Sequence, residues 1–421
     1  MIHRLLFEGQ INIQRRTYVW NMLSSMFYSV QSALFLLVAT RVAGEAEAGS
    51  FIILFTVAQT LNTVGNYNIR DFQVSDVREE YGFPVYLTTR LITCAAMLAL
   101  AVAYCFWKRL SSGAATVMLC LAAYRMLECL EDVFHGAIQR AGRFDVASIC
   151  TTSRVILSSA GFCVAYILCG SQVPASVALL AVCAVTGAYL LHVVRTEFRG
   201  ITPIRLSSEG IPRLLVACFP IFIGAFLYTY LINVPKYAIA DLMSAEAQTI
   251  FNILFMPAFV INILSMIIFK PLTVKMSLDW NDGNYRRFGA RIARQSALVI
   301  GLTAAIILAG DLIGLRLLAL MYGVDLAQYR AVFALLLLFG GISAMSYFAN
   351  MVLTIIRAQI YTIVAYLLAL IISMLVTRPL IQWGGILGAA LAYGCICTTQ
   401  VLVVYGVILW KLGRKKGRSA A

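Results

Sequence analysis

One stretch of the sequence, residues 124–143, concentrates ionisable side chains in an otherwise apolar part of the chain. It reads YRMLECLEDVFHGAIQRAGR. Spacings of three, four and three residues place four of these side chains within an arc of about 80° on a helix. They are Arg125, Glu128, Asp132 and His135. Glu131 lies beside the arc. A face of this kind can hold ion pairs, exchange protons or bind a charged ligand.

Composition places this face inside a membrane. Of the 421 residues, 61% are hydrophobic and 12% are charged, whereas soluble domains are about half apolar and a quarter charged. Such a chain lacks the polar surface that water requires. Charges at membrane depth cost about 2.5–3.5 kcal/mol each. We therefore expect the charged face of 124–143 to point into protein or into a water-filled cavity.

Two interpretations of this face stay open. The first is a structural ion-pair network that joins three adjacent helices, in which arginines of neighbouring segments satisfy the carboxylates. Its members are Arg90, Arg154, Glu131 and Asp132. The second is a substrate or proton site built on Arg125 and Glu128, because Arg125 is expected nearest the membrane midplane.

Twelve apolar segments are long enough to cross a bilayer. They are 18–40, 48–68, 85–106, 114–138, 146–169, 174–194, 212–234, 247–269, 292–318, 329–354, 358–378 and 384–410. An even number puts both termini on one side. The connections on that side carry 22 of the 33 Lys and Arg residues and the opposite connections carry 7, which predicts cytoplasmic termini in a multi-pass protein of the cell membrane.

A polar connection divides the chain into two halves. We expect an N-terminal lobe over 1–195, a cytoplasmic linker over 196–211, and a C-terminal lobe over 212–421 with a basic tail. The two halves share a short internal sequence repeat. AEAGSFIILF begins at Ala46, and the similar AEAQTIFNILF begins at Ala245. Because six crossings preserve orientation, the lobes would be related by a pseudo-two-fold axis along the membrane normal. The fold class is therefore an all-α integral membrane protein with two six-helix lobes.

Uncharged polar side chains form stripes on the first two segments. The stripes contain Asn21, Ser24, Ser25, Tyr28, Gln31 and Ser32, and then Gln59, Asn62, Thr63 and Asn66. A third polar group ends the seventh segment, with Tyr228, Tyr230, Asn233 and Lys236. Such stripes either bond neighbouring helices or line a hydrated cavity that binds sugar hydroxyls, and both alternatives stay open.

Several function classes are excluded or disfavoured. The sequence has no G-x-S-x-G, H-E-x-x-H, Walker A or D-x-D motif, so we expect no enzyme. The 11 cysteines and 3 histidines show no metal-ligand spacing, and no metal or cofactor is expected. MIHRLLFEGQINIQRR is too polar for a cleavable signal peptide. The basic tail KLGRKKGRSAA predicts contact with anionic lipids rather than nucleic acid.

Three motifs resemble a known family. They are GNYNIRDFQVSDVREEY (65–81), the 124–143 stretch, and INVPKYAIADLMSAEAQTIFNILFMPAFVINILSMIIFKPL (232–272). They are similar to the polysaccharide flippases of the MOP superfamily, in the Wzx-type and teichoic-acid branch with its MATE-like fold. The resemblance extends from the first segment to RLLALMYG at the end of the ninth.

The resemblance implies a central cavity that alternates between the two membrane faces and carries a polyprenyl-(pyro)phosphate-linked oligosaccharide or teichoic-acid precursor. Glycan polymerase or ligase machinery and membrane lipids would be its partners. Cationic residues would hold the phosphate and polar residues the sugars, namely Arg125, Arg154, Lys236, Arg90, Asn21, Gln31, Asn62, Asn66, Tyr228 and Asn233. Proton or ion coupling would fall on Glu128, Glu131 and Asp132.

Three alternatives remain. A cation-coupled drug antiporter of the same superfamily would share the fold, although such antiporters often carry an acidic residue in the first segment and 18–40 has none. A membrane glycan polymerase usually needs a large external loop, whereas the external connections here are about 5–15 residues long. A non-transporting scaffold would leave the intramembrane charges without a purpose.

Overall fold

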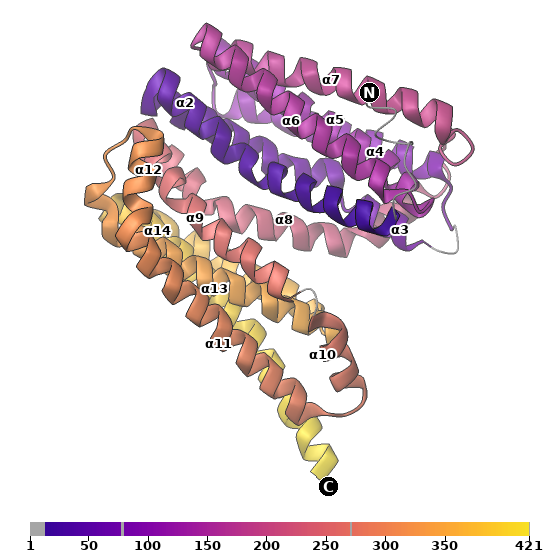
Figure 1. Cartoon of the computed structure of the whole chain (residues 1–421), viewed down its shortest axis with the longest axis vertical. Coiled ribbons are helices and arrows are strands. Elements are labelled where there is room, and N and C mark those ends of the chain that lie inside the picture. The colour runs from indigo at the N-terminus through magenta and orange to yellow at the C-terminus, as the bar shows by residue number, and fades with distance from the viewer. Residues whose placement is uncertain (1–12, 77–79, 270–271, 421) are drawn as a thin grey trace. The chain divides into compact units, whose positions relative to one another are not determined.

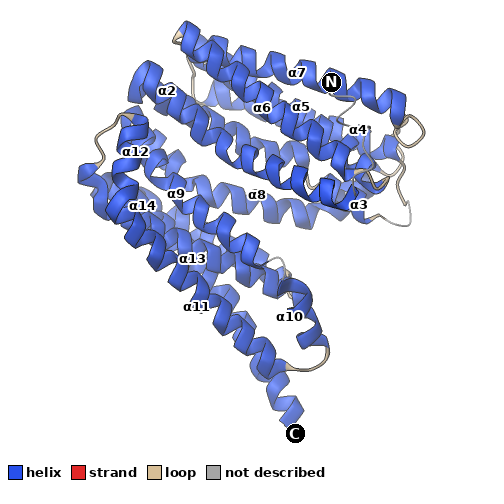
Figure 2. Ribbon diagram, in the orientation of Figure 1, coloured by secondary structure: helices blue, strands red, loops and turns tan. Residues whose placement is uncertain are grey.

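The structure is a computed structural model that describes residues 13–76, 80–269 and 272–420. Throughout these residues the regular elements are helices, and no strand occurs among them (Figure 2). Two family-like motifs extend beyond the described residues, at 77–79 and at 270–271.

The described part of the first half of the chain forms seven helices, of which the first six pack side by side in a bundle (Figure 1). They are α2 (Ile13–Asn66), α3 (Ile69–Ser75), α4 (Phe83–Trp107), α5 (Ser112–Arg140), α6 (Phe144–Cys169), α7 (Gln172–Glu197) and α8 (Ile211–Leu242). Those of the second half are α9 (Ala245–Phe269), α10 (Leu272–Asn281), α11 (Tyr285–Ala309), the π-helix η1 (Gly310–Gly314), α12 (Leu315–Tyr322), the 3₁₀ turn η2 (Ala327–Tyr329), α13 (Arg330–Ile355) and α14 (Ile360–Ala420).

The helices have the length and composition of membrane crossings. The helices α4 to α8 run from 25 to 32 residues, and about 20 apolar residues cross the hydrocarbon core. Among the described residues, nine helical segments meet this standard. Large apolar side chains such as Leu168, Val185 and Met374 lie exposed on them, which suits contact with lipid tails. A multi-pass membrane protein is indicated.

Two of the long helices are broken at a glycine. In α2 the break is at Gly44 (φ 85°, ψ 176°), and in α14 it is at Gly385 (φ 55°, ψ −125°). Only glycine adopts such positive φ values without strain. Gly44 lies between the expected segments 18–40 and 48–68, and Gly385 lies at the start of the expected segment 384–410.

The chain divides into two compact units, Met1–Phe226 and Leu227–Ala421. The division falls inside α8, beyond the expected linker at 196–211. The first turns of α8 belong to the first unit because Leu214 and Cys218 join its apolar core. The prediction of the two lobes with a linker at 196–211 stays a prediction.

Within the first unit, α5 is the central helix. It packs against α2, α3, α4, α6 and α7. A cluster of aromatic rings packs between α2 and α6. The ring centres of Phe35 and Phe162 are 4.1 Å apart, and those of Phe51 and Phe162 are 5.0 Å apart. With helices on all these sides, α5 can bury its polar face only by pairing it with polar groups from its neighbours.

The bend in α14 depends on Gly388. A Cβ atom at this position would overlap the backbone carbonyl of Leu380, so the backbone would have to move. We expect Gly388→Ala to destabilise the protein by on the order of 2 kcal/mol and to lower its melting temperature in detergent. Gly406→Ala is the matched control, because nothing lies within 4 Å of the added Cβ. Equal melting temperatures for the two variants would contradict this account of the bend.

Candidate functional site

The ionisable face of α5 lies inside the first unit. Arg125, Glu128, Glu131 and His135 are buried, and only the side chain of Asp132 keeps noticeable exposure, at 24%. The expectation that this face points into protein is confirmed. Together these side chains contact α2, α3, α4 and α6, so the face joins α5 to four other helices.

Glu128 lies at the centre of the cluster and is shared by two arginines. Arg125 approaches its Oε2 through Nη1 at 2.5 Å, and Arg154 of α6 approaches its Oε1 through Nη1 at 2.6 Å. Arg154 also places its Nε 2.8 Å from Oε2 of Glu131. Arg154 is therefore held between two carboxylates, and Glu128 between two cations.

Asp132 forms a second centre one turn farther along α5. Arg90 of α4 approaches its Oδ2 at 2.9 Å, and Arg70 of α3 approaches its Oδ1 at 2.8 Å. Arg90 also donates to the backbone carbonyls of Gly65 and Asn66, at 3.0 and 2.5 Å. The sequence predicted that Arg90 and Arg154 would satisfy Glu131 and Asp132 without assigning the partners, and the structure pairs Arg90 with Asp132 and Arg154 with Glu131.

Arg70 also belongs to the cluster. From the sequence it was expected only as one of the positive charges on the side of the membrane that holds the termini. The chain turns at Tyr67 and Asn68, whose φ values are 44° and 51°, and then enters α3. This turn brings Arg70 against α5, where it also donates to Oε1 of Gln139 at 3.0 Å. The sequence feature that could have indicated a role for Arg70 in the cluster is its position within the family-like motif 65–81.

Arg125 is enclosed by aromatic rings. Its guanidinium carbon lies 4.8 Å from the ring centre of Phe55, 5.2 Å from that of Tyr124 and 5.7 Å from that of Tyr28. Its Nη1 donates to the hydroxyl of Tyr28 at 3.0 Å. Its Nε is buried and has no hydrogen-bond partner among the described residues. Arg125 thus keeps one donor unused, as Arg90 does through its Nε. Tyr28, which contacts Arg125, is only partly buried.

The cluster carries more positive than negative charge. Among the described residues, four arginines share three carboxylates, namely Arg70, Arg90, Arg125 and Arg154 with Glu128, Glu131 and Asp132. His135 adds a buried ring whose Nδ1 lies 3.4 Å from the hydroxyl of Thr151. A net positive cluster inside apolar helices attracts an anion.

The neutral polar residues of α2 bond neighbouring helices. Gln31 donates to the hydroxyls of Tyr124 and Ser159, at 3.1 and 3.0 Å. Asn62 accepts from the thiol of Cys129 at 2.9 Å.

Two further members of these stripes are less buried. Asn66 accepts through its side chain from Arg90 at 3.2 Å, and Asn21 keeps part of its side chain exposed. Interhelical bonding therefore accounts for the observed contacts of Gln31, Asn62 and Asn66. Their roles toward a sugar stay predictions.

Three predicted binding residues lie in the second unit, on α8. Lys236 is buried, with Nζ 4.8 Å from the ring centre of Phe255. Asn233 donates to a backbone carbonyl of its own helix at 3.0 Å, and the ring of Tyr228 lies 6.1 Å from that of Tyr366. The structure therefore brings the arginine cluster together in one unit and Tyr228, Asn233 and Lys236 in the other.

Comparison with known proteins gives structural neighbours only. No known family profile matches the sequence, and no curated protein matches it. A multidrug resistance MATE transporter of the MOP superfamily, in its inward-facing conformation, superposes with a TM-score of 0.68 at 12% identity, covering 92% of this chain and 96% of that one. The chain has the fold of these transporters.

Two further neighbours agree with that fold. An outward-facing MATE multidrug resistance transporter gives a TM-score of 0.58 at 13% identity, covering 98% of each chain. A MOP superfamily transporter from Pyrococcus furiosus Vc1, described as having a binding pocket of reverse polarity that suggests a different function, gives 0.59 at 12% identity, covering 96% of this chain and 95% of that one. The fold thus occurs in inward- and outward-facing states.

No metal centre is visible in the parts of the chain that the structure describes, since no group of three or more His, Cys, Asp or Glu side chains is placed to hold an ion there.

The pairing of Arg154 gives a stability prediction. In Arg154→Met, Glu131 loses the cation beside it and Glu128 keeps Arg125 alone, and breaking a buried pair costs about 3–5 kcal/mol. We expect a melting temperature several degrees lower, measured by size-exclusion fluorescence after heating. The matched control is Arg330→Met, which breaks the exposed pair with Asp311 and should change little. If both variants melted like wild type, the cluster would not hold the helices together.

Proposed function

We propose that the protein exports a polyprenyl-(pyro)phosphate-linked oligosaccharide or teichoic-acid precursor from the inner to the outer leaflet by alternating access. The observation that carries the proposal is the excess of arginine over carboxylate in the buried cluster of the first unit, with one donor of Arg125 unused. An anionic headgroup supplies the missing negative charge. The inward- and outward-facing forms of the fold support the alternation.

The proposed topology has twelve crossings in two six-helix lobes, with both termini in the cytoplasm. The helices α2 and α14 would each cross twice, because each is broken at a glycine. The remaining crossings would be α4, α5, α6, α7, α8, α9, α11 with α12, and α13. The distribution of Lys and Arg over the connections supports the cytoplasmic termini.

The arginines of the cluster differ in the number of carboxylates and backbone carbonyls that hold each of them, and an arginine with fewer such partners can bind a ligand more readily. Arg154 is held by two carboxylates, and Arg90 by one carboxylate and two backbone carbonyls. Among the described residues, Arg125 has only Glu128 as an ionic partner, and Glu128 would keep Arg154 if Arg125 turned away. Arg125 is therefore the residue that would bind the phosphate, while Arg90 and Arg154 position the helices around it.

Tyr28 would control access to Arg125. Its hydroxyl accepts from Nη1 of Arg125, and its partly exposed ring covers the guanidinium. A rotation of Tyr28 would let a phosphate oxygen take the place of the phenol oxygen, so that Arg125 would donate to an anionic acceptor in place of a neutral one. The sugar part would then meet the more exposed polar groups of α2, Asn21 among them.

Transport in the outward direction needs no ATP in this scheme. The polyprenyl tail would stay in lipid while the protein shields the headgroup. Moving one negative charge outward across an inside-negative membrane is favourable by about 2.3 kcal/mol per 100 mV. Glycan polymerase or ligase enzymes would be the expected partners, because they consume the exported carrier. The protein itself would be a transporter and not an enzyme.

A cation-coupled drug antiporter is a second candidate, favoured by one observation. Oε1 of Glu131 is buried and has no hydrogen-bond partner among the described residues. A carboxylate in that state can accept a proton, and proton uptake at Glu131, with Glu128 and Asp132 beside it, would couple to efflux. Proton or sodium flux accompanying drug efflux from loaded vesicles would support this candidate over the flippase.

Arg125 provides the test of the flippase proposal. We expect Arg125→Gln to slow export of a polyprenyl-phosphate-linked glycan at least about tenfold in proteoliposomes, because a hydrogen bond to a charged group contributes about 1.5–3 kcal/mol. Export is measured as the glycan made accessible to an external glycosidase. Arg195→Gln removes the same charge from an exposed site at the end of α7 and should leave the rate unchanged.

The variants must also be compared as folded proteins. Arg125→Lys keeps the charge beside Glu128 and should show an intermediate rate with a melting temperature near wild type. A well-folded Arg125→Gln protein that exports at the wild-type rate would remove Arg125 from the binding site and contradict the proposal.

A further inference from the structure

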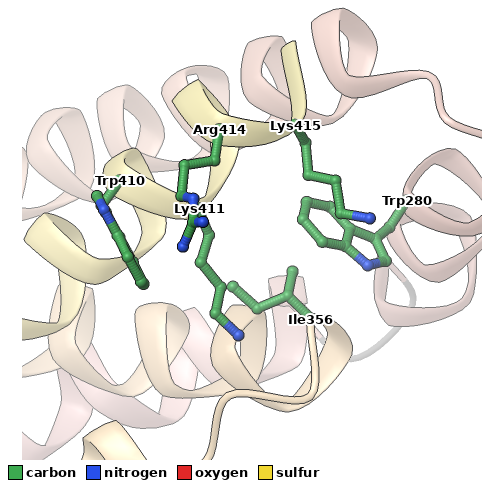
Figure 3. A pocket seen from close by; sticks show the side chains of 6 residues that line it. All are labelled: Trp280, Ile356, Trp410, Lys411, Arg414 and Lys415. Atoms are coloured by element: carbon green, nitrogen blue, oxygen red, sulfur yellow. The ribbon is translucent and has the colours of Figure 1, made fainter. Parts of the chain in front are cut away.

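A basic pocket lies in the second unit, far along the sequence from the arginine cluster. It has a volume of about 330 Å³ and is lined by Trp280, Ile356, Trp410, Lys411, Arg414 and Lys415. Figure 3 shows the two tryptophans on opposite sides of the pocket, with Lys411 between them. The end of α14 supplies four of these residues, and α10 and the residue after α13 supply one each.

The wall that carries Trp280 is fixed by its own contacts. Its ring centre lies 5.2 Å from those of both Tyr285 and Phe288 on α11. The preceding residue, Asp279, is nearly buried and forms an ion pair with Arg291. The acidic residue next to this wall is therefore already neutralised, and the α10–α11 turn is held in place.

Among the described residues that line it, the pocket combines three cations with no carboxylate. Lys411, Arg414 and Lys415 are spaced at three and four residues, so they share one face of α14 and repel one another. Two of the cations lie near aromatic rings, with the guanidinium carbon of Arg414 5.2 Å from the ring centre of Trp410 and Nζ of Lys411 5.9 Å from that of Tyr361. An anion between the cations would remove the repulsion.

The surroundings of the pocket favour a lipid over a free anion. Leu409 and Trp410, directly before the basic residues, expose 66% and 50% of their surface, as residues facing lipid at the end of a crossing do. Tryptophan is enriched at headgroup depth, and clustered Lys and Arg attract anionic lipids. The pocket is formed by α10, the residue after α13 and the end of α14. These parts of the chain lie at the connections on the side of the termini, which the distribution of Lys and Arg predicts to be cytoplasmic.

We propose that this pocket binds the phosphate of a lipid headgroup at the cytoplasmic membrane surface. The three cations would hold the phosphate oxygens, and Trp280 and Trp410 would flank the glycerol or prenyl carbon atoms next to them. Bulk anionic phospholipids and the polyprenyl phosphate carrier present the same group. The proposal rests on the predicted topology and does not depend on which molecule the protein transports.

The experiment measures lipid binding to the full-length protein by native mass spectrometry in detergent. The probes are phosphatidylglycerol, phosphatidylcholine, an unglycosylated polyprenyl phosphate and inorganic phosphate. The test variant is Lys411→Gln/Arg414→Gln/Lys415→Gln. The matched control is Arg195→Gln/Arg199→Gln/Arg205→Gln, which removes three exposed cations of the first unit that are also predicted to be cytoplasmic.

We expect wild type and the control variant to bind an anionic lipid at least about tenfold more tightly than phosphatidylcholine, and the test variant to lose that preference. A preference for phosphatidylglycerol supports the proposal with bulk lipid as the source. A preference for polyprenyl phosphate over phosphatidylglycerol supports it with the carrier as the source. Trp280→Ala, which changes no charge, should weaken binding of either lipid several-fold.

Three outcomes would overturn the proposal. One is an equal loss of anionic-lipid binding in the test and control variants, which would mean that only net charge matters. Another is binding of inorganic phosphate at least as tight as that of the lipids. The last is an unchanged lipid preference in the test variant. Because the three substituted cations lie at a helix end, a melting temperature near wild type is expected and should be checked first.

Discussion

The carboxylate of Glu128 is shared by two arginines, and the organisation of the first unit depends on that sharing. A charge taken out of water inside apolar helices is strongly unfavourable unless another charge and further hydrogen bonds satisfy it. Glu128 meets this requirement through Arg125 on its own helix and Arg154 on α6. Asp132 meets it through Arg90 on α4 and Arg70 on α3. The ion pairs of α5 thereby link it to α3, α4 and α6.

In the proposed function, the same pairing assigns a structural role to Arg154 and a binding role to Arg125. Arg154 cannot leave Glu131 without exposing a buried charge, whereas Arg125 can turn away from a carboxylate that keeps a second partner. A transporter needs both kinds of residue, because its helices must keep their packing while a binding group changes partners. The charged face of α5 was interpreted either as a structural ion-pair network or as a binding site. In the proposed function both interpretations apply, the first to Arg90 and Arg154 and the second to Arg125. The fold itself is that of MOP superfamily transporters, whereas the proposed cargo rests on the charge balance of the cluster.

Much of the fold was predictable from the sequence, because the length of an apolar segment indicates a membrane-crossing helix without reference to the rest of the chain. The break at Gly44 lies between two expected segments, and depth and helix face predicted that Arg90 and Arg154 would satisfy Glu131 and Asp132, although not which arginine pairs with which carboxylate. Arg70 was not predictable as a partner of Asp132, since its position depends on two consecutive residues with positive φ before α3. The boundary between the units in α8 also depends on tertiary contacts, because α8 is apolar throughout and only packing shows that Leu214 belongs to the first unit. Likewise, the sequence could not tell that Gln31 bonds Tyr124 and Ser159.

The most direct measurement is depletion of this protein in its host, followed by mass spectrometry of the extracted polyprenyl-linked glycans. The leaflet of each species is assigned by its accessibility to an external glycosidase. The account predicts that one lipid-linked glycan accumulates in a protected, inner-leaflet form, and its mass would identify the cargo. An unchanged pool of lipid-linked glycans would contradict the account and favour the drug antiporter. Accumulation of short repeat units on the outer face would contradict it as well and favour a polymerase.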